Sequence, residues 1–149
     1  MHQKQGIMRR YFIVILALLL GVGGCEKEQT LKKNQYYVLW ITARVVDEAG
    51  EPIQGIYVYP EGAKFPGREG YTDYKGEMGG NTHIDPYKSV KIVFEDVDGE
   101  YNRGTWATRV VDISSLLTPP QESDSNGFLG SSFIELGDIE LMQVDFADN

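Results

Sequence analysis

The segment 43–58 constrains the fold most strongly, because its pattern is typical of a strand, a tight turn and a second strand. Gly50 can adopt a positive φ angle, and Pro52 has no backbone N–H to offer to a sheet, so both residues belong in the turn. A second turn signal follows at 72–78, Thr-Asp-Tyr-Lys-Gly-Glu-Met. Turns spaced this closely favour short strands over helices.

The segment 36–47 is the longest predicted strand, and its residues alternate between two faces. The more apolar face is expected to point into the core, and it holds Tyr37, Leu39, Ile41, Ala43 and Val45. Further strands are expected at 56–59, 71–72, 89–95, 105–113 and 133–143. The segments 79–88 and 116–131 are rich in Gly, Pro, Asn, Asp and Ser, which predicts an irregular segment and a mobile loop.

A total of six or about seven short strands, with no convincing amphipathic helix, predicts an all-β fold. The expected architecture is an antiparallel Greek-key β-sandwich over residues 36–143. A single open sheet would leave one apolar face in water, so two sheets should pack together.

The amino terminus predicts a targeting segment that is not part of this fold. Lys4, Arg9 and Arg10 form a cationic region ahead of nine apolar residues at 12–20. A membrane-spanning helix needs ~20 such residues, so this pattern indicates a signal peptide. Met8 is an alternative start, because Arg9 and Arg10 would still supply the cationic region.

The end of this segment resembles the lipobox of bacterial lipoproteins, on Gly23, Gly24 and Cys25. The resemblance implies removal of residues 1–24 and attachment of a lipid to Cys25. The protein would then be a membrane-anchored lipoprotein of the cell envelope, at the outer membrane or periplasmic face, with surface exposure also open. A polar tether at 25–35 would link the lipid to the domain, and an acidic tail at 144–149 would follow it.

Charge and cysteine content exclude several functions. Cys25 is the only cysteine, which excludes an internal disulfide or a Cys-x-x-Cys redox pair. After Cys25 the chain holds 11 of its 14 Lys and Arg residues and all 22 Asp and Glu residues, a formal charge of −11. A protein this acidic repels phosphate backbones, so no nucleic-acid partner is expected.

The two turn segments resemble the recurring motif of the transthyretin-like, carboxypeptidase-regulatory-like sandwich group. The matching residues are Asp47, Gly50, Pro52, Ile53, Gly55, Ile56, Thr72, Asp73 and Gly76. This resemblance implies a fold but no activity, since the group serves as add-on and adhesion modules.

A second resemblance covers nearly the whole chain. The lipobox, the sandwich motif, the segment 93–100 and the strand at 139–141 are similar to lipoproteins of Bacteroidetes-type bacteria that accompany a radical S-adenosylmethionine (SAM) enzyme. The resemblance implies that such an enzyme is the partner of this protein, or that it modifies this protein as its substrate.

Asp96, Asp98 and Glu100 are candidate metal ligands, because clustered carboxylates suit calcium. They fit an EF-hand loop poorly, and a solvated hairpin turn is the alternative. Calcium is therefore the one candidate ion, and no other cofactor is expected.

His83 is the only histidine after Cys25, and the chain has no Gly-x-Ser-x-Gly elbow and no His-x-x-x-His spacing. We therefore expect no enzymatic activity.

Tyr71 and Tyr74 flank a turn and are expected to be exposed. Exposed rings can stack on sugars or peptides, so a glycan- or peptide-binding module of the cell envelope is the alternative function. Strand propensity alone also accounts for many of the tyrosines.

Overall fold

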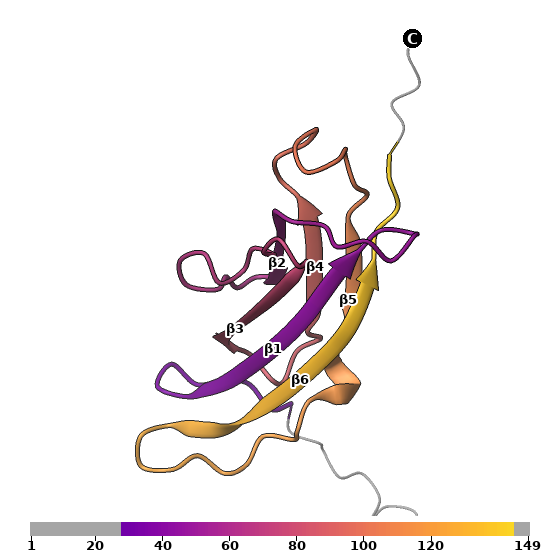
Figure 1. Ribbon diagram of the computed structural model, residues 1–149. Helices are drawn as coiled ribbons and strands as arrows, with labels where there is room; N and C mark the ends of the chain where they lie inside the picture. The colour runs from indigo at the N-terminus through magenta and orange to yellow at the C-terminus, as the bar shows by residue number, and fades with distance from the viewer. Residues whose placement is uncertain (1–27, 145–149) are drawn as a thin grey trace, which may run out of the picture.

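Two three-stranded sheets face each other across an apolar core in the computed structural model, which describes residues 28–144 (Figure 1). The first sheet has the order β3 (Glu77–Ile84), β1 (Tyr36–Val46), β6 (Phe128–Glu140). The second has the order β2 (Ile56–Pro60), β4 (Lys91–Asp96), β5 (Arg109–Asp112). A short 3-10 helix, η1 (Ser114–Leu116), follows β5. The chain is therefore an all-β protein, as its sequence predicts.

The inward side chains of β1 fill the core, which confirms the predicted face of that strand. Tyr37, Leu39, Ile41, Ala43 and Val45 are all buried, while the residues between them are half-buried or exposed. Strand side chains alternate between two faces, so one apolar face is enough to fix the orientation of β1.

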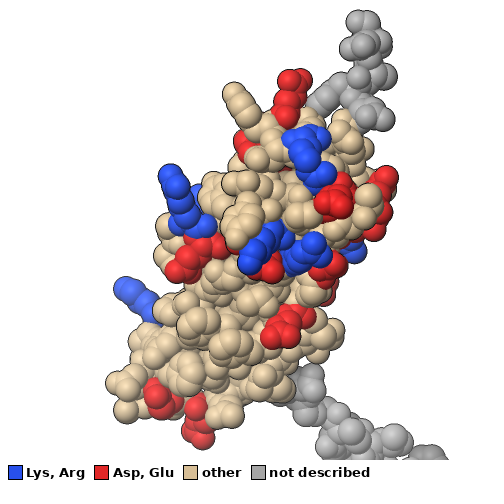
Figure 2. All heavy atoms as spheres, in the orientation of Figure 1, with Lys and Arg blue, Asp and Glu red and all other residues tan. Residues whose placement is uncertain are grey.

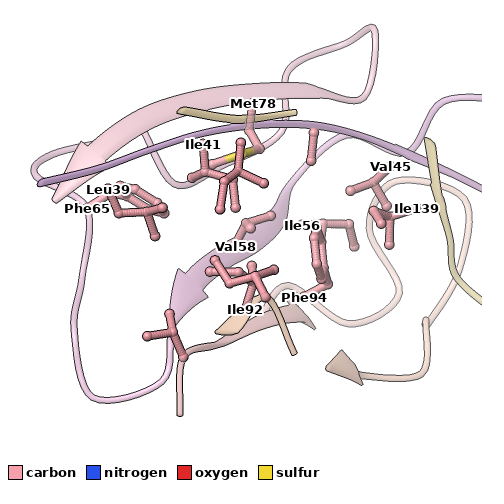
Figure 3. Close-up of a cluster of buried hydrophobic side chains, with 14 of the residues drawn as sticks. Leu39, Ile41, Val45, Ile56, Val58, Phe65, Met78, Ile92, Phe94 and Ile139 are labelled. Atoms are coloured by element: carbon pink, nitrogen blue, oxygen red, sulfur yellow. The ribbon is translucent and has the colours of Figure 1, made fainter. Parts of the chain in front are cut away.

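The second sheet meets β1 with an equally apolar face, and Figure 3 shows the two sets of side chains pointing toward each other. Ile56 and Val58 come from β2, and Ile92 and Phe94 from β4. Val90, Ile92 and Phe94 alternate along the 89–95 segment, and all three are buried.

The pairing of β1 with β6 corrects one prediction. β1 pairs with β3 antiparallel but with β6 parallel, so the expectation of a purely antiparallel fold is wrong at this edge. The segment 117–127 carries the chain from the second sheet to the start of β1, where the Tyr36 N–H donates to the Gly127 carbonyl. β6 therefore begins beside the start of β1 and runs in the same direction.

The described residues contain six strands rather than about seven. The expected strand at 71–72 is a single bridge between Tyr57 and Tyr71, and the expected strand at 105–113 shortens to β5. The final strand begins at Phe128, inside the segment predicted to be a mobile loop.

The segment 79–88 was predicted to be irregular, but most of it belongs to β3. Gly80 serves packing rather than a turn, since a Cβ at this position would lie 3.0 Å from the Phe65 ring. Glycine lets another side chain approach the strand backbone closely, which the glycine count alone does not reveal.

Three Asp-x-x-Gly loops, at 47–50, 73–76 and 124–127, share one geometry. In each loop one aspartate oxygen accepts hydrogen bonds from the backbone N–H groups two and four residues later, at 2.8–3.0 Å. The loop glycine has φ between 74° and 85°, a conformation that glycine adopts without steric cost. The first two loops were predicted as turns, and the third lies in the segment expected to be mobile.

Thr72 connects the second loop to the core. Its buried hydroxyl donates to the Ile53 carbonyl at 2.7 Å and accepts from the Ile56 N–H at 3.0 Å. One side chain thus satisfies two backbone groups at the entry to β2.

We expect Thr72→Val to lower the free energy of unfolding by roughly 2–4 kcal/mol, because two buried backbone groups lose their partner. Denaturant unfolding measures the loss. Thr72→Ser keeps the hydroxyl and removes only the methyl group, so it should lose clearly less; a loss in Thr72→Val no larger than that in Thr72→Ser would contradict the role of the two hydrogen bonds.

Candidate functional site

A groove lined by tyrosines lies on the outer side of β2 and β4. We call it the tyrosine groove; it has a volume of about 760 Å³ and is lined mainly by Tyr57, Tyr59, Lys64, Tyr71, Glu95 and Val97. The ring centroids of Tyr57 and Tyr59 are 4.9 Å apart, and those of Tyr57 and Tyr71 are 4.7 Å apart. Three tyrosine rings therefore form one continuous aromatic surface.

Local backbone geometry brings these rings together. Tyr57 and Tyr59 alternate with the buried Val58 on β2, so both rings point outward. The segment ahead of Tyr71 comes close to β2, where the Val58 N–H donates to the Gly70 carbonyl. A Cβ on Gly70 would lie 2.8 Å from the Val58 carbonyl oxygen, so this close approach requires glycine.

One carboxylate borders the tyrosine groove. Glu95 lies opposite Tyr57 in the register of β2 and β4, and it accepts a hydrogen bond from the Tyr59 hydroxyl at 2.9 Å. That hydrogen bond, with a further contribution from burial, raises the pKa of Tyr59 above its ordinary value. The groove thus offers ring faces beside a polar edge, which suits a ligand with both apolar and hydroxyl-bearing surfaces.

The two tyrosines singled out by the sequence have different settings. Tyr71 is 42% exposed and belongs to the tyrosine groove, whereas Tyr74 is 72% exposed and lies outside it, with the Lys75 ammonium 5.7 Å from its ring centroid. Both are exposed, as predicted. Sequence reasoning missed Glu95 as a partner, because its position opposite Tyr57 depends on strand register.

The acidic turn after β4 has a structural role. Asp96 accepts hydrogen bonds from the backbone N–H groups of Asp98, Gly99 and Trp106, at 2.9–3.2 Å. Glu100 is exposed, and Asp98 accepts from the Asn102 side-chain amide. Across residues 28–144, no three His, Cys, Asp or Glu side chains are grouped to hold a metal ion. Calcium binding at Asp96, Asp98 and Glu100 stays a prediction.

His83 lies on β3, on the outer side of the first sheet. It is exposed, and its ring centroid is 5.1 Å from that of Tyr36. Cys25, the predicted lipid attachment site, lies outside the described residues. Within the described part of the chain, no helix has the length and apolar character needed to cross a membrane.

A second aromatic surface was not anticipated from the sequence. We call it the aromatic face; it lies on the outer side of β1 and β6 and consists of Tyr36, Trp40, Phe128 and Phe133. The rings of Trp40 and Phe133 stack at 5.3 Å and 3°, and those of Tyr36 and Phe128 are 5.5 Å apart. The alternation of β1 placed Trp40 on the outer side, but its pairing with Phe133 comes from the parallel register.

No protein-family model matches this chain, and no curated protein does.

Asp98 offers a test of the electrostatics of the acidic turn. Burial raises the pKa of Asp98, and the neighbouring Asp96 carboxylate adds to this effect. The ionised form therefore destabilises the folded state at neutral pH. This cost is relieved as the pH falls through the raised pKa toward the unfolded value.

We expect Asp98→Asn to raise the melting temperature at neutral pH, with the gain shrinking on acidification. Thermal unfolding of both proteins across pH measures the effect. Glu100→Gln, on the exposed side of the same turn, should change little, and an equal gain in both variants would point to net charge instead.

Proposed function

We propose that this protein is a lipid-anchored, extracytoplasmic lipoprotein of the cell envelope, with no enzymatic activity of its own. The observation that carries the proposal is the short apolar run at 12–20 followed by Gly-Gly-Cys25, the only cysteine. Its domain is a Greek-key sandwich of the transthyretin-like, carboxypeptidase-regulatory-like type. The two facing three-stranded sheets support this finer assignment, as does the paired Asp-x-x-Gly motif.

The start of the described chain is compatible with an anchor close to the domain. Leu31 packs against the core, and the Gln35 N–H donates to the Lys32 carbonyl in a turn before β1. The Gln35 side chain also donates to the Ser123 hydroxyl at 3.2 Å. Residues 31–35 are thus held against the domain, which leaves only a short stretch between them and Cys25.

We further propose that a radical SAM enzyme is the partner of this lipoprotein, or modifies it as a substrate. The support is the sequence resemblance over the lipobox, the sandwich motif, the segment 93–100 and the final strand. An accessory role of this kind needs a stable domain that is presented at the membrane.

Intact mass spectrometry tests this proposal. In its native host, the protein should lack residues 1–24 and carry a lipid on Cys25, while Cys25→Ala should stay unprocessed. The intact mass of the native form should exceed that of the same chain made without the enzyme by one reproducible increment. Equal masses would contradict the substrate role, and an intact signal segment would contradict the lipoprotein assignment.

A second candidate function is a glycan- or peptide-binding module, and the tyrosine groove favours it. Its three rings form a continuous surface, and the Glu95 carboxylate and Lys64 border it. Aromatic rings stack on the apolar faces of sugars or on peptide side chains, and neighbouring polar groups fix the orientation.

We expect Tyr71→Ala to weaken binding at least ~10-fold in a titration of any ligand found by glycan and peptide arrays, since one lost stacking contact costs about 1.4 kcal/mol or more. Tyr74→Ala is the matched control, because it removes an exposed tyrosine three residues away that lies outside the groove. Equal losses in both variants would show that the tyrosine groove is not the binding site.

A further inference from the structure

The aromatic face exposes large rings that no segment of residues 28–144 covers. Phe133 is 77% exposed and Trp40 is 40% exposed, although the two rings stack on each other. Tyr36 and Phe128 extend the surface to the first residues of β1 and β6. Single exposed apolar residues are ordinary, but a stacked Trp–Phe pair with a second aromatic pair on the same sheet face marks a candidate interaction surface.

Charged groups are concentrated away from this surface. In Figure 2 they gather mainly over the upper part of the molecule, while the lower part, where β1 and β6 begin in Figure 1, is mostly uncharged apart from acidic groups at its lower edge. Farther along the same sheet face, Arg44 and Asp138 form an exposed ion pair at 3.0 Å. The aromatic face therefore occupies one end of the sheet and gives way to charge toward the other end.

The anchor approaches this same end of the sheet. Tyr36 is the first residue of β1 and follows directly on the turn at Lys32–Gln35. Leu31 lies six positions after Cys25 in the sequence. Even fully extended, six residues span only ~20 Å, so a lipid on Cys25 would hold this end of the domain close to the bilayer.

We propose that the aromatic face lies on the surface of the lipid bilayer and inserts its rings at headgroup depth. This inference rests on the lipid anchor of the proposed function. Trp and Tyr suit this depth, because their amphipathic rings prefer the boundary between hydrocarbon and water, and Phe adds apolar area that is buried there. The lipid that fits is zwitterionic, because a domain with this acidic charge is repelled by an anionic surface.

Chemistry and geometry together favour a lipid occupant over a protein one. The short link from Cys25 limits the distance between this sheet end and the bilayer to ~20 Å, so the bilayer is within reach of the aromatic face. One weak lipid contact is enough here, because the anchor supplies a high effective concentration of bilayer. The result would be a domain held flat on the membrane, with the tyrosine groove on the opposite sheet open to solvent.

The two tryptophans allow a direct test. Trp40 belongs to the aromatic face, whereas Trp106 is buried and only 6% exposed. The full lipoprotein, purified with its lipid, is reconstituted into phosphatidylethanolamine–phosphatidylcholine vesicles with or without brominated acyl chains. Trp106→Phe leaves Trp40 as the only reporter in the mature chain, and Trp40→Phe leaves Trp106.

We expect brominated lipid to quench Trp40 fluorescence roughly twofold and to shift its emission to the blue, since a ring at headgroup depth lies near the upper acyl carbons. Trp106 fluorescence should stay unchanged. Phe133→Glu combined with Trp106→Phe should abolish the quenching while the protein stays on the vesicles, because a charge at the stacked ring opposes insertion.

Separate measurements test the lipid anchor and the position of the aromatic face. Intact mass and flotation with the vesicles report the lipid on Cys25, and Trp40 reports the position of the domain. A lipidated protein whose Trp40 is unquenched would overturn this inference and leave the lipoprotein assignment standing. If Trp40 were shielded from solvent in native membranes but not in these vesicles, the aromatic face would be assigned to a protein partner. Absence of the lipid would overturn both proposals.

Replacing Trp106 removes buried packing but no hydrogen bond, because its Nε1–H has no acceptor among the described residues. If Trp106→Phe nevertheless unfolds, the Trp40 signal is obtained by subtracting the fluorescence of Trp40→Phe from that of the wild-type protein. A difference signal without quenching would contradict the proposal just as directly.

Discussion

The burial of one face of β1 is the constraint on which the rest of the structure depends. Five alternating side chains of β1 fill the space between the sheets, and both edges of the strand are paired, with β3 on one side and β6 on the other. A shift of one residue in register would turn Tyr37 and Leu39 outward and bring Val38 and Trp40 into the core. The outward position of Trp40 follows from the same constraint.

Repeated turn chemistry surrounds this central strand. The same aspartate hydrogen bonds close the loops after β1, before β3 and before β6. In each loop one aspartate carboxylate satisfies two nearby backbone N–H groups. Thr72 then connects the second loop to β2, which places Tyr71 beside Tyr57. Turn geometry therefore contributes to the tyrosine groove as well as to the fold.

The tyrosine groove and the aromatic face lie on the outer sides of the two sheets. Only some of their features could be predicted from the sequence. The outward positions of Trp40 and Tyr57 follow from strand alternation, and the exposure of Tyr71 and Tyr74 was predicted correctly. The neighbours of these rings were not predictable. Glu95 lies opposite Tyr57, and Phe133 opposite Trp40, only because of pairings between segments more than 30 residues apart in the sequence.

The sequence alone determined the all-β class, the inward face of β1, the Asp-x-x-Gly turns at 47–50 and 73–76, and the expectation of a lipid anchor at Cys25. These features are local, because alternation, turn residues and an apolar run act over a few neighbouring positions. Tertiary structure alone decided the parallel pairing of β6, the strand character of β3, and the ring partners in both aromatic surfaces. These features depend on contacts between segments far apart in the sequence. Burial across the whole core selects the pairing partners, and no local spacing of residues encodes that selection.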